Sequence, residues 1–94
     1  MLNSKQRAKL RSLASLEETI FQLGKEGITE NFIRSVDLAL AKRELIKFKI
    51  LENAGLDKRE AAAEVAEATG SEVVTVIGSK AVLYRPAEEP VIRL

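Results

Sequence analysis

Hydrophobic residues recur at helical spacing in three segments of the chain, with polar residues between them. The first predicted helix begins at Asn3 or Ser4, because either residue suits a helix N-cap, and it continues to about Ala14. Gln6 stands three residues after Asn3, the spacing of a capping box. The N-terminal segment therefore predicts an amphipathic helix with a defined start.

Two further helices are predicted from the same signals. Thr29 is expected to cap a helix that extends to about Ala41. Asp57 opens the third helix, with Glu60 as its capping-box partner, and Gly70 fits the position just after the last turn.

Four shorter segments have the character of strands. The clearest alternates Ile46, Phe48 and Ile50 with Lys47 and Lys49, which predicts one buried face and one basic face. The last two strands are joined through a short turn, most simply a hairpin. They are apolar at nearly every position, so both sheet faces are expected to be partly covered. The predicted strands are Thr19–Leu23, Leu45–Leu51, Val73–Ile77 and Ala81–Arg85.

The resulting order, α-β-α-β-α-β-β, indicates an α/β fold. Right-handed helical crossovers and a closing hairpin would give a compact single domain with a mixed four-stranded sheet. A chain of 94 residues fits one domain, which we assign to residues 1–86. Residues 87–94 follow Arg85-Pro86, have no periodicity, and are expected to form a loose tail.

Composition excludes several classes of site. The chain has no cysteine and no histidine, so thiolate zinc sites, disulfides and histidine general bases are absent. No apolar run approaches the roughly 20 residues of a membrane helix, and the first eleven residues lack a secretory signal. We therefore expect a cytoplasmic protein with no membrane partner, and nothing in the sequence requires more than a monomer.

Catalytic chemistry has little support in the sequence. Fourteen carboxylates are present, but no spacing selects a converging acid–base pair. Glu60, Glu64 and Glu67 share one helix face, and a solvated face is the favoured interpretation over a cation site. Gly24-Lys25 lacks the flanking glycine and hydroxyl residue of a phosphate-binding P-loop. We expect no enzyme activity, no cofactor and no metal.

A Gly-x-x-Gly segment, Gly24 to Gly27, leads directly into the second predicted helix. Glycines allow close approach to a ligand, and a helix N-terminus favours anions. Gly-x-x-Gly loops clamp nucleic-acid backbones in KH domains. A tight turn that requires glycine explains the same residues, and Glu26 inside the loop opposes a phosphate.

Charge is unevenly distributed although the net charge is only +1. The first eleven residues carry four basic side chains and no acidic one, whereas residues 55–72 carry two basic and five acidic residues. A basic face is compatible with this polarity. A solvated helix face, and charges that protect a strand edge, are the alternatives. The basic residues in question are Lys5, Arg7, Lys9, Arg11, Lys47 and Lys49.

Taken together, the ordered motifs resemble the CRM domain, named for chloroplast RNA splicing and ribosome maturation. The resemblance covers Leu2 to Pro86 and is closest to the stand-alone bacterial YhbY type. Each motif alone is weak, but the ordered set is specific. The motifs are Gly24 to Ile33, Glu44 to Lys47, Ala68 to Gly70, Val76 to Gly78 and Val82 to Pro86.

The resemblance implies a compact α/β fold similar to the C-terminal domain of a bacterial translation initiation factor. It implies RNA binding, and association of single-domain bacterial members with precursors of the large ribosomal subunit. The family's Gly-x-x-Gly loop, held to contact RNA, corresponds here to Gly24, Lys25, Glu26 and Gly27. Glu26 departs from the family pattern, in which this position often holds a small or uncharged residue.

Three hypotheses follow. The leading one is a non-catalytic protein that binds ribosomal RNA, not DNA, through the loop, with the six basic residues named above as flanking contacts. The second is a module that docks on ribosomal proteins or another factor through its acidic helix and the apolar end Val91 to Leu94. The third is a small metal-dependent hydrolase built on carboxylates.

Overall fold

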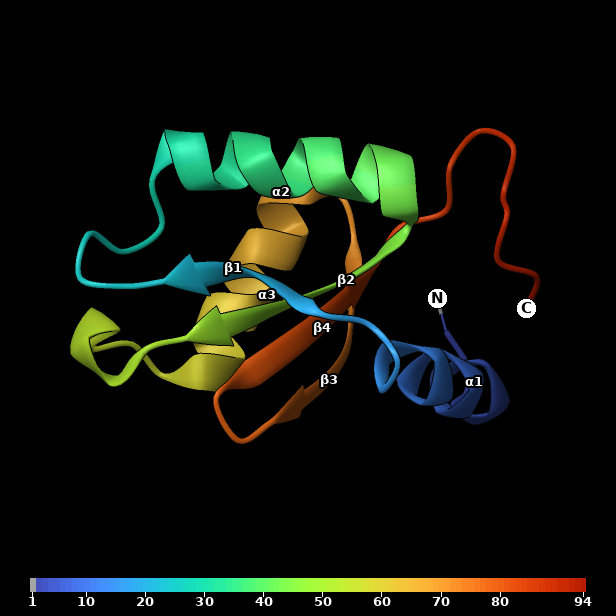
Figure 1. Ribbon diagram of the computed structural model, residues 1–94, viewed down its shortest axis with the longest axis horizontal. Helices are drawn as coiled ribbons and strands as arrows, with labels where there is room; N and C mark the ends of the chain where they lie inside the picture. Colours follow the sequence, from blue (N-terminus) through green and yellow to red (C-terminus); the bar gives the residue numbers. More distant parts are fainter. Residues whose placement is uncertain (1) are drawn as a thin grey trace.

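Helices and strands follow one another in the predicted order, α-β-α-β-α-β-β, in the computed structural model, which describes residues 2–94 (Figure 1). The second helix is two residues longer than predicted. The second strand ends one residue early because Leu51 leads into a 3₁₀ turn. The elements are α1 Ser4–Ala14, β1 Thr19–Leu23, α2 Glu30–Arg43, β2 Leu45–Ile50, η1 Glu52–Ala54, α3 Lys58–Thr69, β3 Glu72–Ile77 and β4 Lys80–Tyr84.

The predicted N-cap residues are present, and of the capping box expected at α3 the structure shows the Asp57 half. Asn3 and Gln6 form both hydrogen bonds of a capping box at the start of α1. The hydroxyl of Thr29 accepts from the Phe32 N–H at 3.0 Å, and the carboxylate of Asp57 accepts from the Glu60 N–H at 2.9 Å. Local side chains therefore set where all three helices begin.

The sheet is mixed, as predicted, with strand order β1-β2-β4-β3. β1 and β2 are parallel and are joined by α2, while β4 is antiparallel to both of its neighbours. α3 carries the chain past β4 to the edge position of β3, and the short turn after β3 brings β4 back between β3 and β2. The expected α/β class and hairpin are confirmed.

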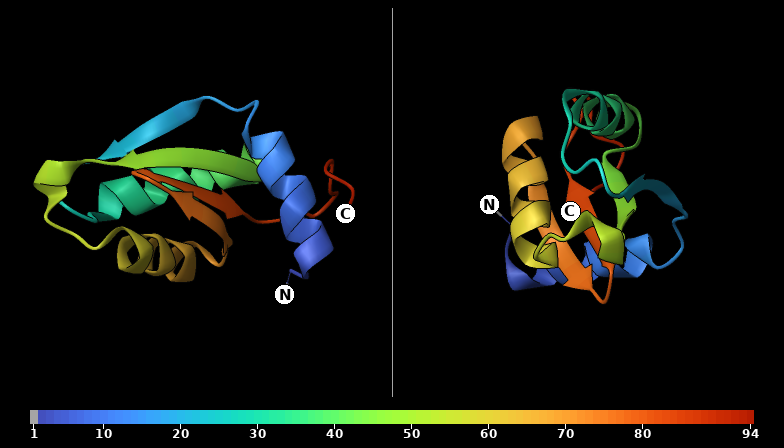
Figure 2. Two further views of the ribbon diagram at one scale, coloured as in Figure 1. Left: turned by 90° about the horizontal axis from the view of Figure 1, so that it is seen from below. Right: turned by 90° about the vertical axis from the view of Figure 1, so that its left-hand side faces the viewer.

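Both faces of the sheet carry a hydrophobic cluster, as the apolar last strands predict. The larger cluster joins α2 and α3 to one face, and the smaller one joins α1 to the other. β4 contributes to both: Ala81 and Leu83 belong to the first cluster, Val82 and Tyr84 to the second. Figure 2 shows that α1 lies across one end of the sheet, so the rest of that face is left without a helix.

Residues 87–94 form no helix or strand, but side chains hold their backbone, chiefly that of Glu44. The carboxylate of Glu44, at the end of α2, accepts the N–H groups of Ala87, Val91 and Ile92 at 2.8–2.9 Å. Ile92 also packs against the smaller hydrophobic cluster. The sequence analysis did not anticipate these contacts. Between residues 2 and 94, no helix has the length and apolar character needed to cross a bilayer.

Candidate nucleic-acid interface

The Gly-x-x-Gly segment forms a tight turn between β1 and α2. The Gly27 N–H donates to the Gly24 carbonyl at 2.9 Å, which places Lys25 and Glu26 at the exposed tip. Gly27 has φ +74°, a left-handed conformation that favours glycine, whereas a Cβ on Gly24 would make only ordinary contact with Leu51. The backbone conformation thus requires one of the two glycines.

The start of α2 presents backbone donors next to this turn. Thr29 accepts the N–H of Phe32 through its hydroxyl and that of Ile33 through its carbonyl. Helix geometry leaves the N–H groups of Glu30 and Asn31 without an acceptor inside the helix. The helix dipole favours an anion here, while the carboxylates of Glu26 and Glu30 oppose one. Lys25 supplies the local positive charge.

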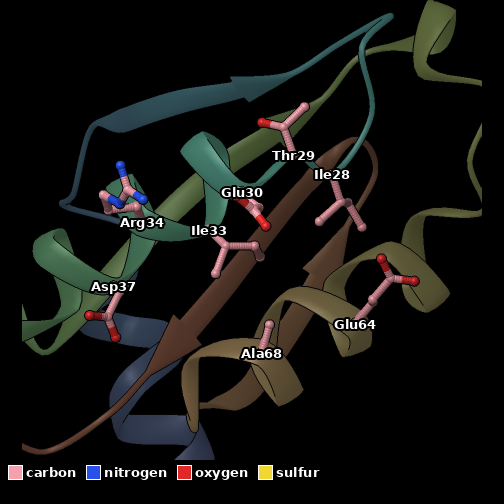
Figure 3. A pocket seen from close by; sticks show the side chains of 8 residues that line it. All are labelled: Ile28, Thr29, Glu30, Ile33, Arg34, Asp37, Glu64 and Ala68. Atoms are coloured by element: carbon pink, nitrogen blue, oxygen red, sulfur yellow. The ribbon is translucent and has the colours of Figure 1, made fainter.

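A groove of about 620 Å³ separates α2 from α3. Glu30 and Glu64 lie on its two sides, and Arg34 points away from α3 (Figure 3). Asp37 is paired with Arg85 at 2.6 Å. The carboxylates of Glu30 and Glu64 thus outnumber the one unpaired guanidinium in the lining, that of Arg34, and this negative balance disfavours a phosphate ligand. The Glu60, Glu64 and Glu67 face is exposed, and residues 2–94 contain no group of three carboxylates placed to hold a metal ion.

The sheet face on which α1 packs carries both predicted strand lysines, and only Lys49 lies on the part that α1 leaves open. Lys47 is half-buried, and its ammonium donates to the Ala14 carbonyl at 3.0 Å, at the C-terminus of α1. Lys49 lies further along β2, in a hollow of about 560 Å³ that Lys80 also lines. Lys49 faces Gln22 in β1, and Leu51 donates to the Leu23 carbonyl, so this end of the sheet adjoins the Gly24 turn.

The basic residues of α1 lie at the opposite end of the molecule from the Gly24 turn (Figure 1). The guanidinium of Arg7 donates to the carbonyls of Val73 and Val74 in β3, and the ammonium of Lys9 donates to the Arg93 carbonyl. Lys5 and Arg11 are exposed. The structure therefore groups Lys25 with Lys49 and separates both from the α1 cations.

Sequence reasoning missed the roles of two residues, Lys80 and Glu44. Lys80 stands at the first position of β4, but the sequence analysis placed it in the turn before that strand. Glu44 is 2% exposed and has φ +66°. The N–H of Ala87, together with those of Ile92 and Val91, holds the pKa of the Glu44 carboxyl below its ordinary value, against burial, which raises it.

Comparison with known proteins gives consistent results. The family model of the CRS1/YhbY (CRM) domain matches residues 2–85. The chain is 40% identical over 89 residues to "Probable RNA-binding protein YqeI" of Bacillus subtilis, covering 95% of this chain and 93% of that protein. It is 38% identical to an "RNA-binding protein" of Haemophilus influenzae over 97 residues, with 99% and 94% covered. The solution structure of Staphylococcus aureus SAV1595 superposes with a TM-score of 0.81 at 52% identity, covering 95% and 93%.

Proposed function

This chain belongs to the CRS1/YhbY (CRM) domain family, and on that premise we propose that it is a non-catalytic RNA-binding protein that acts in assembly of the large ribosomal subunit. Relatives that cover nearly its whole length are named RNA-binding proteins. The observation that carries the proposal is the exposed turn Gly24 to Gly27, which presents Lys25 beside the N-terminus of α2.

In this mechanism the turn captures a backbone phosphate of RNA. The ammonium of Lys25 supplies charge, and the first N–H groups of α2 supply hydrogen bonds. The six flanking cations are candidate contacts, of which Lys49 lies at the same end of the sheet as the turn. The α1 cations would reach a second region of a large RNA, because they lie at the other end of the molecule.

Recognition of RNA through its phosphates and shape fits the placement of the aromatic residues. Phe32 makes edge-to-face contacts with Phe21 and Phe48, and all three pack in the larger hydrophobic cluster. Tyr84 is buried in the smaller cluster. Phe21 and Phe32 are half-buried, and no aromatic side chain among residues 2–94 is fully exposed for stacking bases. We therefore expect structured RNA to bind better than random single strands.

Binding to RNA is expected to depend strongly on salt. If about five phosphates are neutralised on unpaired RNA, such as the loop of a hairpin, the association constant falls on the order of a hundredfold between 50 and 200 mM salt. Fluorescence anisotropy with a labelled RNA hairpin, repeated across that range, measures the slope. A flat response would contradict phosphate capture as the source of affinity.

The ribosomal assignment is tested by sedimentation of the tagged protein from cell lysate through density gradients. At low salt we expect comigration with precursors of the large subunit, and at high salt release to the top of the gradient. Treatment of the lysate with ribonuclease is the matched control and should also release the protein. A protein that stays at the top at both salt concentrations would contradict the ribosomal role.

A further inference from the structure

One row of side chains crosses all four strands on the open face of the sheet. Lys49 pairs with Gln22 on one side and with Lys80 on the other, and Lys80 pairs with Ile77. Ile77 is 67% exposed, and Gln22 and Lys80 are exposed as well. The smaller cluster covers the other end of this face, where Leu45 pairs with Tyr84. We call Gln22, Lys49, Lys80 and Ile77 the lysine row.

The two lysines of this row lie opposite each other, and no carboxylate in the described part of the chain neutralises their charges. Like charges directly opposite in an antiparallel pair destabilise a sheet. Neither ammonium has an ion-pair partner among residues 2–94, where the ion pairs are Lys58 with Glu52 and Arg85 with Asp37. The hollow around them contains no carboxylate, since its lining is Thr19, Ile20, Phe21, Gln22, Lys49 and Lys80. An anionic ligand would relieve the repulsion.

We propose that Lys49 and Lys80 bind a backbone phosphate of RNA in this hollow, with the Gln22 amide as a neighbouring hydrogen-bond donor. The inference rests on the proposed function and adds a second phosphate site to it. Gln22 precedes Lys25 by three residues, which span at most about 10 Å. One RNA strand can therefore contact the lysine row and the Gly24 turn together, which favours a polyanion with repeated phosphates over a single small anion.

The test compares two double variants that lose the same charge. Lys49→Gln with Lys80→Gln removes the site, and Arg34→Gln with Lys42→Gln removes two exposed cations of α2 as a control. For a labelled RNA hairpin at 0.1 M salt, we expect the first variant to bind about tenfold more weakly and to lower the salt slope by about 1, because the two lysines together contact one phosphate. The control should lose far less. Lys49→Arg with Lys80→Arg should retain binding.

Thermal unfolding supplies a second readout, because removing like charges should leave Tm unchanged or raise it. A lower Tm for the Lys49→Gln, Lys80→Gln variant would assign the two lysines to fold stability and overturn the proposal.

Unchanged RNA affinity, or an equal loss in the α2 control, would overturn it while leaving the proposed function intact. A wild-type protein that binds no RNA would overturn both. Competition by poly-glutamate as effective as by RNA would assign the hollow to an acidic protein partner.

Discussion

Replacing Glu44 with alanine is expected to lower the free energy of unfolding by about 3 kcal/mol. The carboxylate is buried and accepts three backbone N–H groups of the tail, and hydrogen bonds to a charged acceptor are among the stronger ones. The loss is bounded because a released tail returns its N–H groups to water. Urea unfolding monitored by circular dichroism measures the difference. A loss under about 0.5 kcal/mol, typical of a surface substitution, would contradict a stabilising role for the hydrogen bonds between the Glu44 carboxylate and the tail.

The variant Glu44→Gly distinguishes the stabilising effect of the carboxylate from the cost of the backbone conformation at position 44. Glu44 has φ +66°, which costs a residue with a Cβ of the order of 1 kcal/mol. Both substitutions remove the carboxylate, but glycine also removes this strain. The glycine variant should therefore be the more stable of the two, and equal stability would show that the conformation at position 44 is not strained.

The same carboxyl gives the protein a defined acid sensitivity. Its pKa is lowered in the folded state from the ordinary value of 4.5, chiefly by the Ala87 N–H. The stabilisation is therefore fully present above pH 4.5 and is lost as the pH falls through the folded pKa. The difference in free energy of unfolding between wild type and Glu44→Gln should be constant above pH 4.5 and shrink as the pH falls below it.

Local signals in the sequence were sufficient to predict the helices and strands of this fold. Asn3, Thr29 and Asp57 cap the helices they were expected to cap, because a capping side chain acts on a backbone group two or three residues away. The mixed sheet follows from the order of elements and the handedness of crossovers. Periodicity carries this information because it is itself a local property of the chain.

Contacts between distant segments were not predictable in the same way. Glu44 looks like an ordinary polar residue after a helix, and only the fold brings residues 87–92 to its carboxylate. The Lys49–Lys80 pair depends on the register of β2 against β4, which no periodicity reports. Likewise, the sequence placed four cations in the first helix but did not show at which end of the sheet α1 packs. The candidate loop was found because its glycines and the helix after it are adjacent in sequence.

Reversing the charge at the tip of the turn is expected to have the largest effect on RNA binding. Lys25 is exposed and its ammonium faces no acceptor among residues 2–94, so Lys25→Glu should leave Tm unchanged. The substitution removes one phosphate contact and adds a repulsion of similar size, which together weaken binding about a hundredfold at 0.05 M salt. Anisotropy with the labelled RNA hairpin measures the loss, and binding within threefold of wild type would contradict the loop mechanism.

Glu26→Gln is the matched variant in the same turn and is expected to strengthen binding, because it removes a carboxylate from the proposed phosphate site. The two substitutions also separate the rival hypotheses. Under the rival hypothesis, the protein docks on other proteins through the acidic helix α3 and the end of the chain, and Lys25 makes no contact. Its association with the ribosomal particle would then survive Lys25→Glu. Loss of both RNA binding and particle association in Lys25→Glu, with a gain of both in Glu26→Gln, assigns the association to RNA contact at the Gly24 turn.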